Sequence, residues 1–263
     1  MIRKALENLP KTLDETYERM LLTLYAQAGD SLTLLRRTFA FVPFAKRPMT
    51  VAEVAQAVVI DIGDEKFDRD AAFCDPEDLL SFCHPLVDVS STGHLGFVHH
   101  SVREFFVSDR LANADGGIKE FALNGEACHA EISQLCLTFA CFEDFAGGHC
   151  QTLEELSLRK ERFPFLGYAA AYWTFHGEHR TDDAVVRNLL YKILDPPNYA
   201  NLGSMLQAID YTIGLRSAGG LTHRWWTTLS VMISALASAD ERQAFLTSMF
   251  TLRKEWFSLL EHE

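Results

Sequence analysis

Two adjacent histidines, His99 and His100, are the residues of this 263-residue chain best placed to do chemistry. They follow an apolar run that ends at Val98, and Ser101-x-x-Glu104 behind them has the spacing of a capping box. This pattern predicts imidazoles at a corner between a strand and a helix. A histidine there can contact a phosphate or a neighbouring domain, and its charge changes near physiological pH. The alternative is that His99 is a partly buried strand residue bonded to backbone and that His100 lies on the surface.

The motifs of the common catalytic classes are missing from the sequence. It contains no G-x-x-x-x-G-K-[S/T] phosphate loop, no G-x-G-x-x-G and no G-x-S-x-G nucleophile elbow. We therefore expect that this chain alone does not hydrolyse ATP or GTP, that it holds no cofactor and that it is not an enzyme. A Cys/His hydrolase is the less favoured alternative, because six cysteines and ten histidines suggest pairs without a specific spacing.

The six cysteines are expected to be free thiols, and we expect no metal site. None of them forms a C-x-x-C pair, and no metal-ligand spacing recurs. Three cysteines stand next to histidines, which keeps a zinc protein open as an alternative, but adjacent side chains project in different directions. These pairs are Cys83-His84, Cys128-His129 and His149-Cys150.

The composition is that of an acidic globular protein, with 48% apolar residues and a formal net charge of −12. This charge opposes nucleic-acid binding, which depends on Lys and Arg at the phosphates. No apolar run approaches the roughly 20 residues that span a bilayer, and the first residues lack the apolar core of a signal peptide. We therefore expect a cytoplasmic protein without a DNA or membrane partner.

Helix-start signals and apolar stripes with helical spacing dominate the first 84 residues. The stripes predict helices over 13–28, over 32–42 with an end near Pro43, and over 51–58, followed by a polar loop at 61–69. Asp75-Pro76 predicts the start of a fourth helix that reaches about His84. Capping boxes mark further starts at Thr12/Glu15, Thr50/Glu53, Ser101/Glu104, Thr152/Glu155 and Ser238/Glu241.

Two short strands, 86–90 and 95–99, are predicted next, with a hairpin turn at 91–94. Three helices followed by a hairpin are the order of a winged helix, here with an additional helix in front. The helix 75–84, which would enter a DNA groove, carries three carboxylates and neither Lys nor Arg. Protein contact is therefore favoured over DNA, and a nucleic-acid-binding winged helix stays the runner-up function.

The second half of the chain predicts helices only. The aromatic segment 163–175 is interpreted as core rather than as a ligand site, and a helical stripe at 185–193 follows, which ends at Pro196-Pro197. Further stripes are 132–139, 229–236 and 244–252. The predicted fold is thus mainly α: a linker over 1–12, a winged helix with a short β-hairpin wing over 13–110, and an α-helical bundle or helical-repeat-like domain over 111–263.

Several segments resemble the winged-helix region that follows the NACHT domain in fungal NOD-like receptors of the NACHT–ankyrin type. The resemblance is most specific between residues 5 and 110, and the matching segments are 5–17, 47–57, 75–80, 98–105 and 165–173. Val98-His99-His100 is also similar to the Met-His-Asp motif of plant receptors of the same class, with His100 in place of the aspartate.

The resemblance implies the middle piece of a signalling NTPase of the STAND class, without the NACHT domain and the repeats. In this family the winged helix folds back on the nucleotide domain in the resting state, and a histidine touches the phosphates of ADP. The resemblance assigns that role to His99, in the context of a full-length receptor only. It implies ADP or ATP on an upstream NACHT domain, and that domain, C-terminal repeats and other proteins as partners. Exchange of ADP for ATP would then release the winged helix as a population shift.

Overall fold

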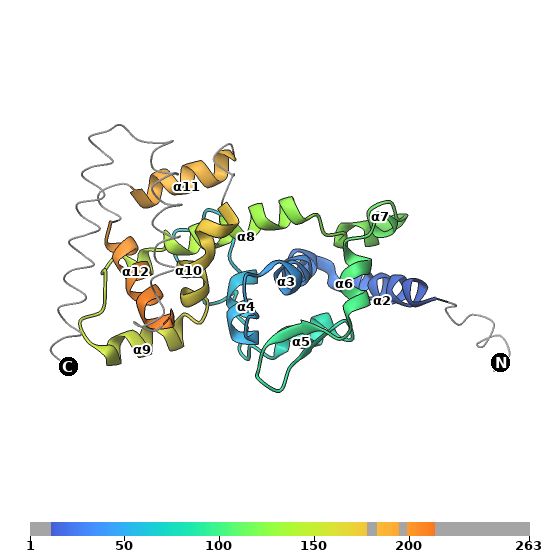
Figure 1. The fold of residues 1–263 in the computed structure, drawn as a ribbon, viewed down its shortest axis with the longest axis horizontal. Coiled ribbons are helices and arrows are strands. Elements are labelled where there is room, and N and C mark those ends of the chain that lie inside the picture. Colours follow the sequence, from blue (N-terminus) through green and yellow to red (C-terminus); the bar gives the residue numbers. More distant parts are fainter. Residues whose placement is uncertain (1–11, 178–182, 195–198, 214–263) are drawn as a thin grey trace. The chain divides into compact units, whose positions relative to one another are not determined.

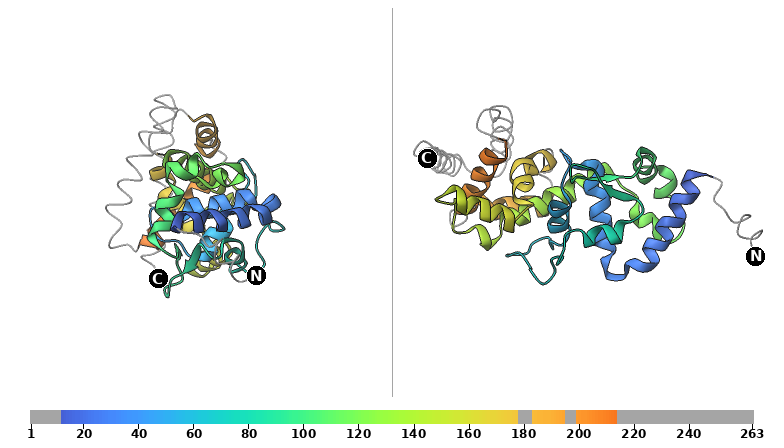
Figure 2. Two further views of the ribbon diagram at one scale, coloured as in Figure 1. Left: turned by 90° about the vertical axis from the view of Figure 1, so that its right-hand side faces the viewer. Right: turned by 90° about the horizontal axis from the view of Figure 1, so that it is seen from below.

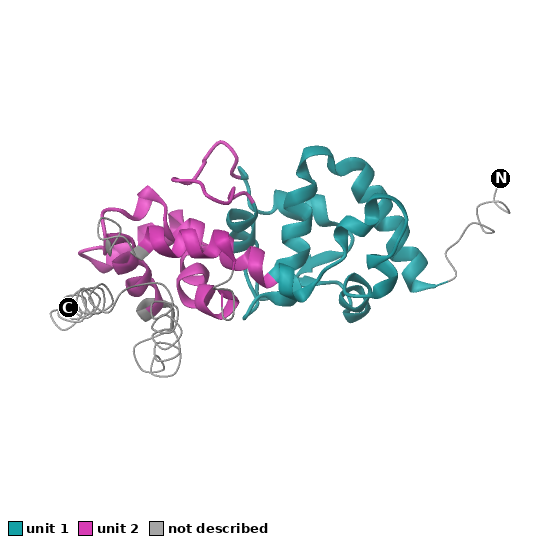
Figure 3. Ribbon diagram, turned by 90° about the horizontal axis from the view of Figure 1, so that it is seen from above, with its two compact units in different colours: residues 1–58, 73–128 teal, residues 59–72, 129–263 magenta. Residues whose placement is uncertain are grey.

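The chain forms two compact units, and the computed structural model describes residues 12–177, 183–194 and 199–213 (Figure 1). Unit 1 takes in the residues up to Val58 together with Phe73–Cys128, and unit 2 takes in Val59–Ala72 and the residues from His129 onward (Figure 3). The change from one unit to the other falls inside helix α8 (Gly125–Ala140). The predicted winged helix over 13–110 thus lies in unit 1 apart from the loop 59–72, and unit 1 continues past residue 110.

Three helices open unit 1, and each coincides with a predicted apolar stripe. Thr12 caps the first helix, since its Oγ1 accepts the N–H of Glu15 at 3.2 Å. At the start of the third, Thr50 Oγ1 accepts the N–H of Glu53 at 3.3 Å, and Glu53 Oε2 accepts the N–H of Thr50 at 2.8 Å. The second helix runs one residue past Pro43. The helices, joined in part by the 3-10 turn η1 (Gly29–Ser31), are α2 (Leu13–Ala28), α3 (Leu32–Phe44) and α4 (Val51–Val58) (Figure 2).

The predicted hairpin is present, but its strands and the preceding helix are shorter than expected. Strands β1 (Val87–Val89) and β2 (Leu95–Phe97) pair antiparallel, with Val87 opposite Phe97 and Val89 opposite Leu95. Helix α5 (Asp78–Cys83) begins three residues after the predicted start, because Asp75 Oδ1 accepts the N–H of Glu77 and the backbone there forms i to i+3 turns. The hairpin is tied to the turn before α4, since the N–H of Leu95 donates to the carbonyl of Met49 at 2.8 Å.

A cluster of phenylalanines fills the core of unit 1 behind this hairpin. Phe39 of α3 is fully buried, and its ring centroid lies 4.8 Å from Phe106, 5.8 Å from Phe121 and 6.5 Å from Phe97. These rings come from four elements, so burial of one aromatic cluster holds the hairpin against the helices. The elements that complete unit 1 are α6 (His100–Phe106), α7 (Asp109–Ala112) and the 3-10 helix η2 (Gly116–Phe121).

Helices are the regular secondary structure of the described part of unit 2, and most of the aromatic residues of the predicted core segment 163–175 are buried. Phe139 packs on Phe145, Phe163 and Phe165 with centroid distances of 5.1–6.1 Å. Asn201 is buried as well and donates from Nδ2 to two carbonyl oxygens. The elements are η3 (Glu143–Phe145), α9 (Leu153–Arg162), α10 (Leu166–Gly177), α11 (Ala184–Leu194) and α12 (Tyr199–Ile213), with α10 packed against α12.

The predicted mainly α class is confirmed, since the described residues form one two-stranded sheet and otherwise helices. None of the described helices has both the length and the apolar character needed to cross a bilayer. The predicted stop at Pro196-Pro197, the Ser238/Glu241 box and the stripes 229–236 and 244–252 lie outside the described residues.

Candidate functional site

His99 stands at the junction between the hairpin and α6, where it caps the helix. Its backbone is extended (φ −154°, ψ 150°), and its Nδ1 accepts the N–H of Ser101 at 3.3 Å. The predicted capping box over Ser101 and Glu104 does not form, because the helix already begins at His100. The imidazole nitrogen of His99 takes the position that a serine or aspartate oxygen occupies in most caps.

The ring of His99 is held by side chains from two helices. Ser101 Oγ lies 2.7 Å from His99 Nδ1, and the hydroxyl of Tyr17 lies 2.7 Å from the same Oγ. Tyr17 belongs to α2, is only 7% exposed and packs its ring 5.6 Å from Phe105. Tyr17, which precedes Ser101 by 84 positions, therefore fixes the geometry of the histidine corner through the hydroxyl of Ser101.

The outer side of this corner faces solvent. His99 and His100 are both exposed, with ring centroids 4.0 Å apart, and Val98 beside them is 50% exposed. Among the described residues, none forms a hydrogen bond with Nε2 of His99. The expectation that His99 is a partly buried strand residue is wrong, because β2 ends at Phe97 and His99 is exposed as the cap of α6. Its bond to backbone agrees with that interpretation, and its exposure makes it accessible to a neighbour.

The segment that contains α5, the hairpin and the histidine pair has no Lys or Arg. Residues 70–102 contain neither Lys nor Arg, and the carboxylates of Asp75, Glu77 and Asp78 next to α5 are exposed. The hairpin turn is closed by polar contacts, such as that between Thr92 Oγ1 and His94 Nδ1 at 2.9 Å. The carboxylates next to α5 repel phosphates, so the helix that would enter a DNA groove is unsuited to DNA.

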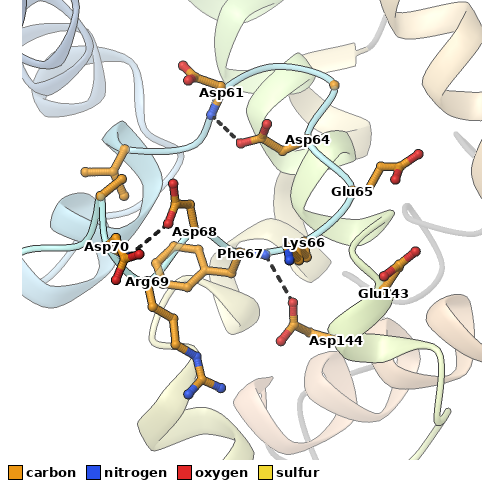
Figure 4. Close-up of a pocket in the computed structure, with 13 residues that line it drawn as sticks. Asp61, Asp64, Glu65, Lys66, Phe67, Asp68, Arg69, Asp70, Glu143 and Asp144 are labelled. Atoms are coloured by element: carbon orange, nitrogen blue, oxygen red, sulfur yellow. Dashed lines mark hydrogen bonds between the residues drawn. The ribbon is translucent and has the colours of Figure 1, made fainter.

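An open pocket of about 1100 Å³ lies in unit 2 (Figure 4). It is lined by the loop at 61–69, which the sequence predicts only as polar. Phe67 anchors the loop, since its ring lies 6.2 Å from Phe163 and its N–H donates to Asp144 Oδ2 at 3.1 Å. Carboxylates line the pocket together with Lys66 and Arg69. In the part of the chain that the structure describes, no three His, Cys, Asp or Glu side chains are arranged to hold a metal ion. The sequence analysis did not predict this pocket. The feature that could have indicated it is the high proportion of charged residues at 61–70.

Burial raises the pKa of four of the described cysteine thiols, those of Cys83, Cys136, Cys141 and Cys150. Five cysteines are buried, Cys74 is exposed, and all six are free. Burial raises the pKa of the Cys83 thiol to about 12, although a hydrogen bond with Thr38 lowers it in part. A raised pKa is the opposite of what a nucleophilic thiol requires. In unit 2, His176 Nδ1 lies 2.8 Å from His129 Nδ1 inside the helical core.

Comparison with known proteins identifies the first unit. Residues 22–124 match the family described as GPI inositol-deacylase, winged helix domain, so this region is a winged-helix domain. The chain is also similar to the azaphilone pigments biosynthesis cluster protein L of Monascus ruber, with 29% identity over 179 residues. That match covers 65% of this chain and 36% of the relative, so the chain spans about a third of the relative's length. No solved structure matches.

Proposed function

We propose that the chain is a non-enzymatic regulatory and protein-interaction module whose winged helix contacts a neighbouring nucleotide-binding domain in the resting state. The neighbour is a NACHT domain of the STAND class, as the sequence resemblance implies, and it supplies the ADP or ATP. C-terminal repeats and other proteins are the further partners of such a receptor. The observation that carries the proposal is the exposed imidazole of His99, whose Nδ1 is engaged by Ser101 while Nε2 is left for an external group.

Hydrogen bonding to a phosphate is what this imidazole can contribute. One hydrogen bond to a charged group contributes about 1.5–3 kcal/mol. That energy stabilises the closed form only to the extent that it is lost in the open form. His99 therefore favours the closed state when ADP places a phosphate against it, and no bond is broken by this chain.

The charge distribution supports a protein partner over DNA. A winged helix that binds DNA needs Lys or Arg at the phosphates, and residues 70–102 provide none. The thiol state of all six cysteines fits a reducing compartment such as the cytosol. We expect no salt-dependent shift of labelled duplex DNA at low micromolar protein, and a shift would favour the nucleic-acid-binding alternative.

The test is ADP affinity in a protein in which a nucleotide-binding domain precedes this chain. His99→Ala should weaken ADP binding by roughly 10- to 100-fold, which is the loss of one charge-assisted hydrogen bond. His94→Ala is the matched control, because the His94 side chain lies in the hairpin turn, where its Nδ1 contacts Thr92 Oγ1, and the backbone contacts of His94 do not depend on its side chain. Equal ADP affinity in the wild type and the His99 variant would remove this residue from the mechanism.

The absence of enzyme activity is tested on this chain itself. We expect the purified chain to release no phosphate from ATP or GTP, because it lacks the loop that cradles the phosphates. Turnover that follows the chain through purification and is lost on replacing one of its residues would overturn the proposal.

A further inference from the structure

We propose that Tyr17 and Ser101 are positioning residues that hold His99 in the tautomer with its proton on Nε2. The ring then presents a hydrogen-bond donor, and the matching ligand chemistry is an acceptor, namely a phosphate oxygen of the docked neighbour. Only the identity of this acceptor rests on the proposed function. The tautomer is a property of the chain itself.

The backbone N–H of Ser101 decides which nitrogen of the ring carries the proton. It lies 3.3 Å from His99 Nδ1, and an amide N–H can only donate. Nδ1 must therefore carry the lone pair. A neutral imidazole has one N–H, so its hydrogen stands on Nε2.

The hydroxyl groups of Ser101 and Tyr17 also donate towards His99. Ser101 Oγ lies 2.7 Å from Nδ1, and because Nδ1 has no hydrogen, the serine hydroxyl donates to it. The remaining lone pairs of Ser101 Oγ accept the hydroxyl of Tyr17, which lies 2.7 Å away. The serine hydroxyl at 2.7 Å and the amide N–H at 3.3 Å then share the single lone pair of Nδ1, and donation runs from Tyr17 through Ser101 to His99.

The opposite tautomer would break this order and present the wrong group to a phosphate. A hydrogen on Nδ1 would face the amide hydrogen of Ser101, and Nε2 would then offer a lone pair to the ligand. Two acceptors repel each other, so this form of His99 could not bind a phosphate oxygen. The hydrogen bonds that run from Tyr17 through Ser101 to His99 therefore favour a ligand with acceptor groups, rather than donor groups, at the exposed Nε2.

Nitrogen NMR of the whole chain labelled with ¹⁵N-histidine tests the proposal. At about pH 8.5 histidine side chains are neutral on average, and long-range ¹H–¹⁵N spectra distinguish a protonated ring nitrogen from an unprotonated one. The signals of His99 are assigned by their loss in His99→Gln, with His100→Gln as a check. We expect Nδ1 to be unprotonated and Nε2 to be protonated in the wild type.

Two variants separate positioning from a merely structural role. Tyr17→Phe and Ser101→Ala should each lower the ratio of the Nε2–H to the Nδ1–H tautomer by about fivefold, the factor expected for one net hydrogen bond. Tyr25→Phe is the matched control, because Tyr25 lies on the same helix and packs its ring on Phe121. The control should leave the ratio unchanged, and circular dichroism shows whether each variant keeps its helices.

The outcomes distinguish this proposal from the proposed function. A wild-type His99 with its proton on Nδ1, or a ratio that neither Tyr17→Phe nor Ser101→Ala alters in folded protein, overturns the positioning role. If the tautomer and its response are as expected but His99→Gln leaves ADP affinity unchanged in a protein with a nucleotide-binding domain, the positioning role stands and the proposed function fails.

Discussion

Replacing Glu53 should destabilise unit 1 far more than replacing any exposed glutamate. Its carboxylate accepts the N–H of Thr50 at 2.8 Å and two N–H groups of Arg47, one of them at 2.9 Å. The Glu53 side chain is 11% exposed and that of Arg47 is 28% exposed, so water replaces these contacts only in part. The turn held in this way includes Met49, whose carbonyl accepts the N–H of Leu95 in the hairpin.

The magnitude follows from which groups lose their partner. Glu53→Ala leaves the N–H of Thr50 without this acceptor and removes the carboxylate that two N–H groups of Arg47 contact. Arg47 is partly rehydrated and still donates to the Pro48 carbonyl, and removing a nearly buried carboxylate also removes its desolvation cost. We therefore expect a loss of about 2–4 kcal/mol in the free energy of unfolding, and about 1–2 kcal/mol for Glu53→Gln, which keeps one acceptor.

Urea unfolding followed by far-UV circular dichroism measures this loss, because none of the four tryptophans lies in unit 1. Glu104→Ala is the matched control, because Glu104 is an exposed helical glutamate that, like Glu53, follows a hydroxyl residue by three positions. The capping box of Ser101 and Glu104 does not form. The control should change the free energy of unfolding by less than about 0.5 kcal/mol. Equal losses for Glu53→Ala and Glu104→Ala would refute the reasoning.

Three further predictions concern the cores of the two units. Burial raises the pKa of Cys83 from 9.0 to about 12, so the stability that the neutral thiol contributes is present below pH 9 and is lost as the pH rises towards 12. Cys83→Ala should remove this alkaline loss, which amounts to at most about 1.4 kcal/mol per pH unit. Urea unfolding at pH 8 and at pH 10 measures the difference. A Cβ on Gly117 would overlap the end of the Tyr25 ring, which is 40% exposed and can turn away, so Gly117→Ala should lower the free energy of unfolding by no more than about 1 kcal/mol, and Tyr25→Ala should remove this cost. Asn201→Ala removes a donor from the Ala140 carbonyl and one of two donors from the Phe142 carbonyl, which keeps the N–H of Phe145, so it should cost about 1–3 kcal/mol, whereas an unchanged thermal midpoint would contradict the role of this side chain in unit 2.

Local patterns predicted the helices and the hairpin of the first unit well. The apolar stripe of α2 and the boxes at Thr12 and Thr50 depend on neighbours three or four residues apart, and such signals can be read along the chain. The start of α6 was misplaced because an imidazole replaces the usual oxygen as cap, and Ser101 two residues later carries the more familiar pattern.

Contacts between distant segments left no local signal in the sequence. The bond between Tyr17 and Ser101 joins residues 84 positions apart, and a helical stripe shows only that Tyr17 is buried. The pocket at 61–70 depends on Phe67 packing against Phe163, although the sequence shows only a charged loop there. The role proposed for His99 rests on the resemblance, whereas the geometry of its ring is visible only in the structure.

Amide hydrogen exchange of residues 97–106 gives the most direct test of the docking of this winged helix. The measurement compares the ADP-bound and ATP-bound states of a protein in which a nucleotide-binding domain precedes this chain. Contact between His99 and the phosphate of ADP predicts slower exchange of these amides with ADP than with ATP, and loss of the difference in His99→Ala. Equal exchange in the two nucleotide states, with both nucleotides shown to be bound, would contradict contact between the winged helix and the nucleotide site of the neighbouring domain.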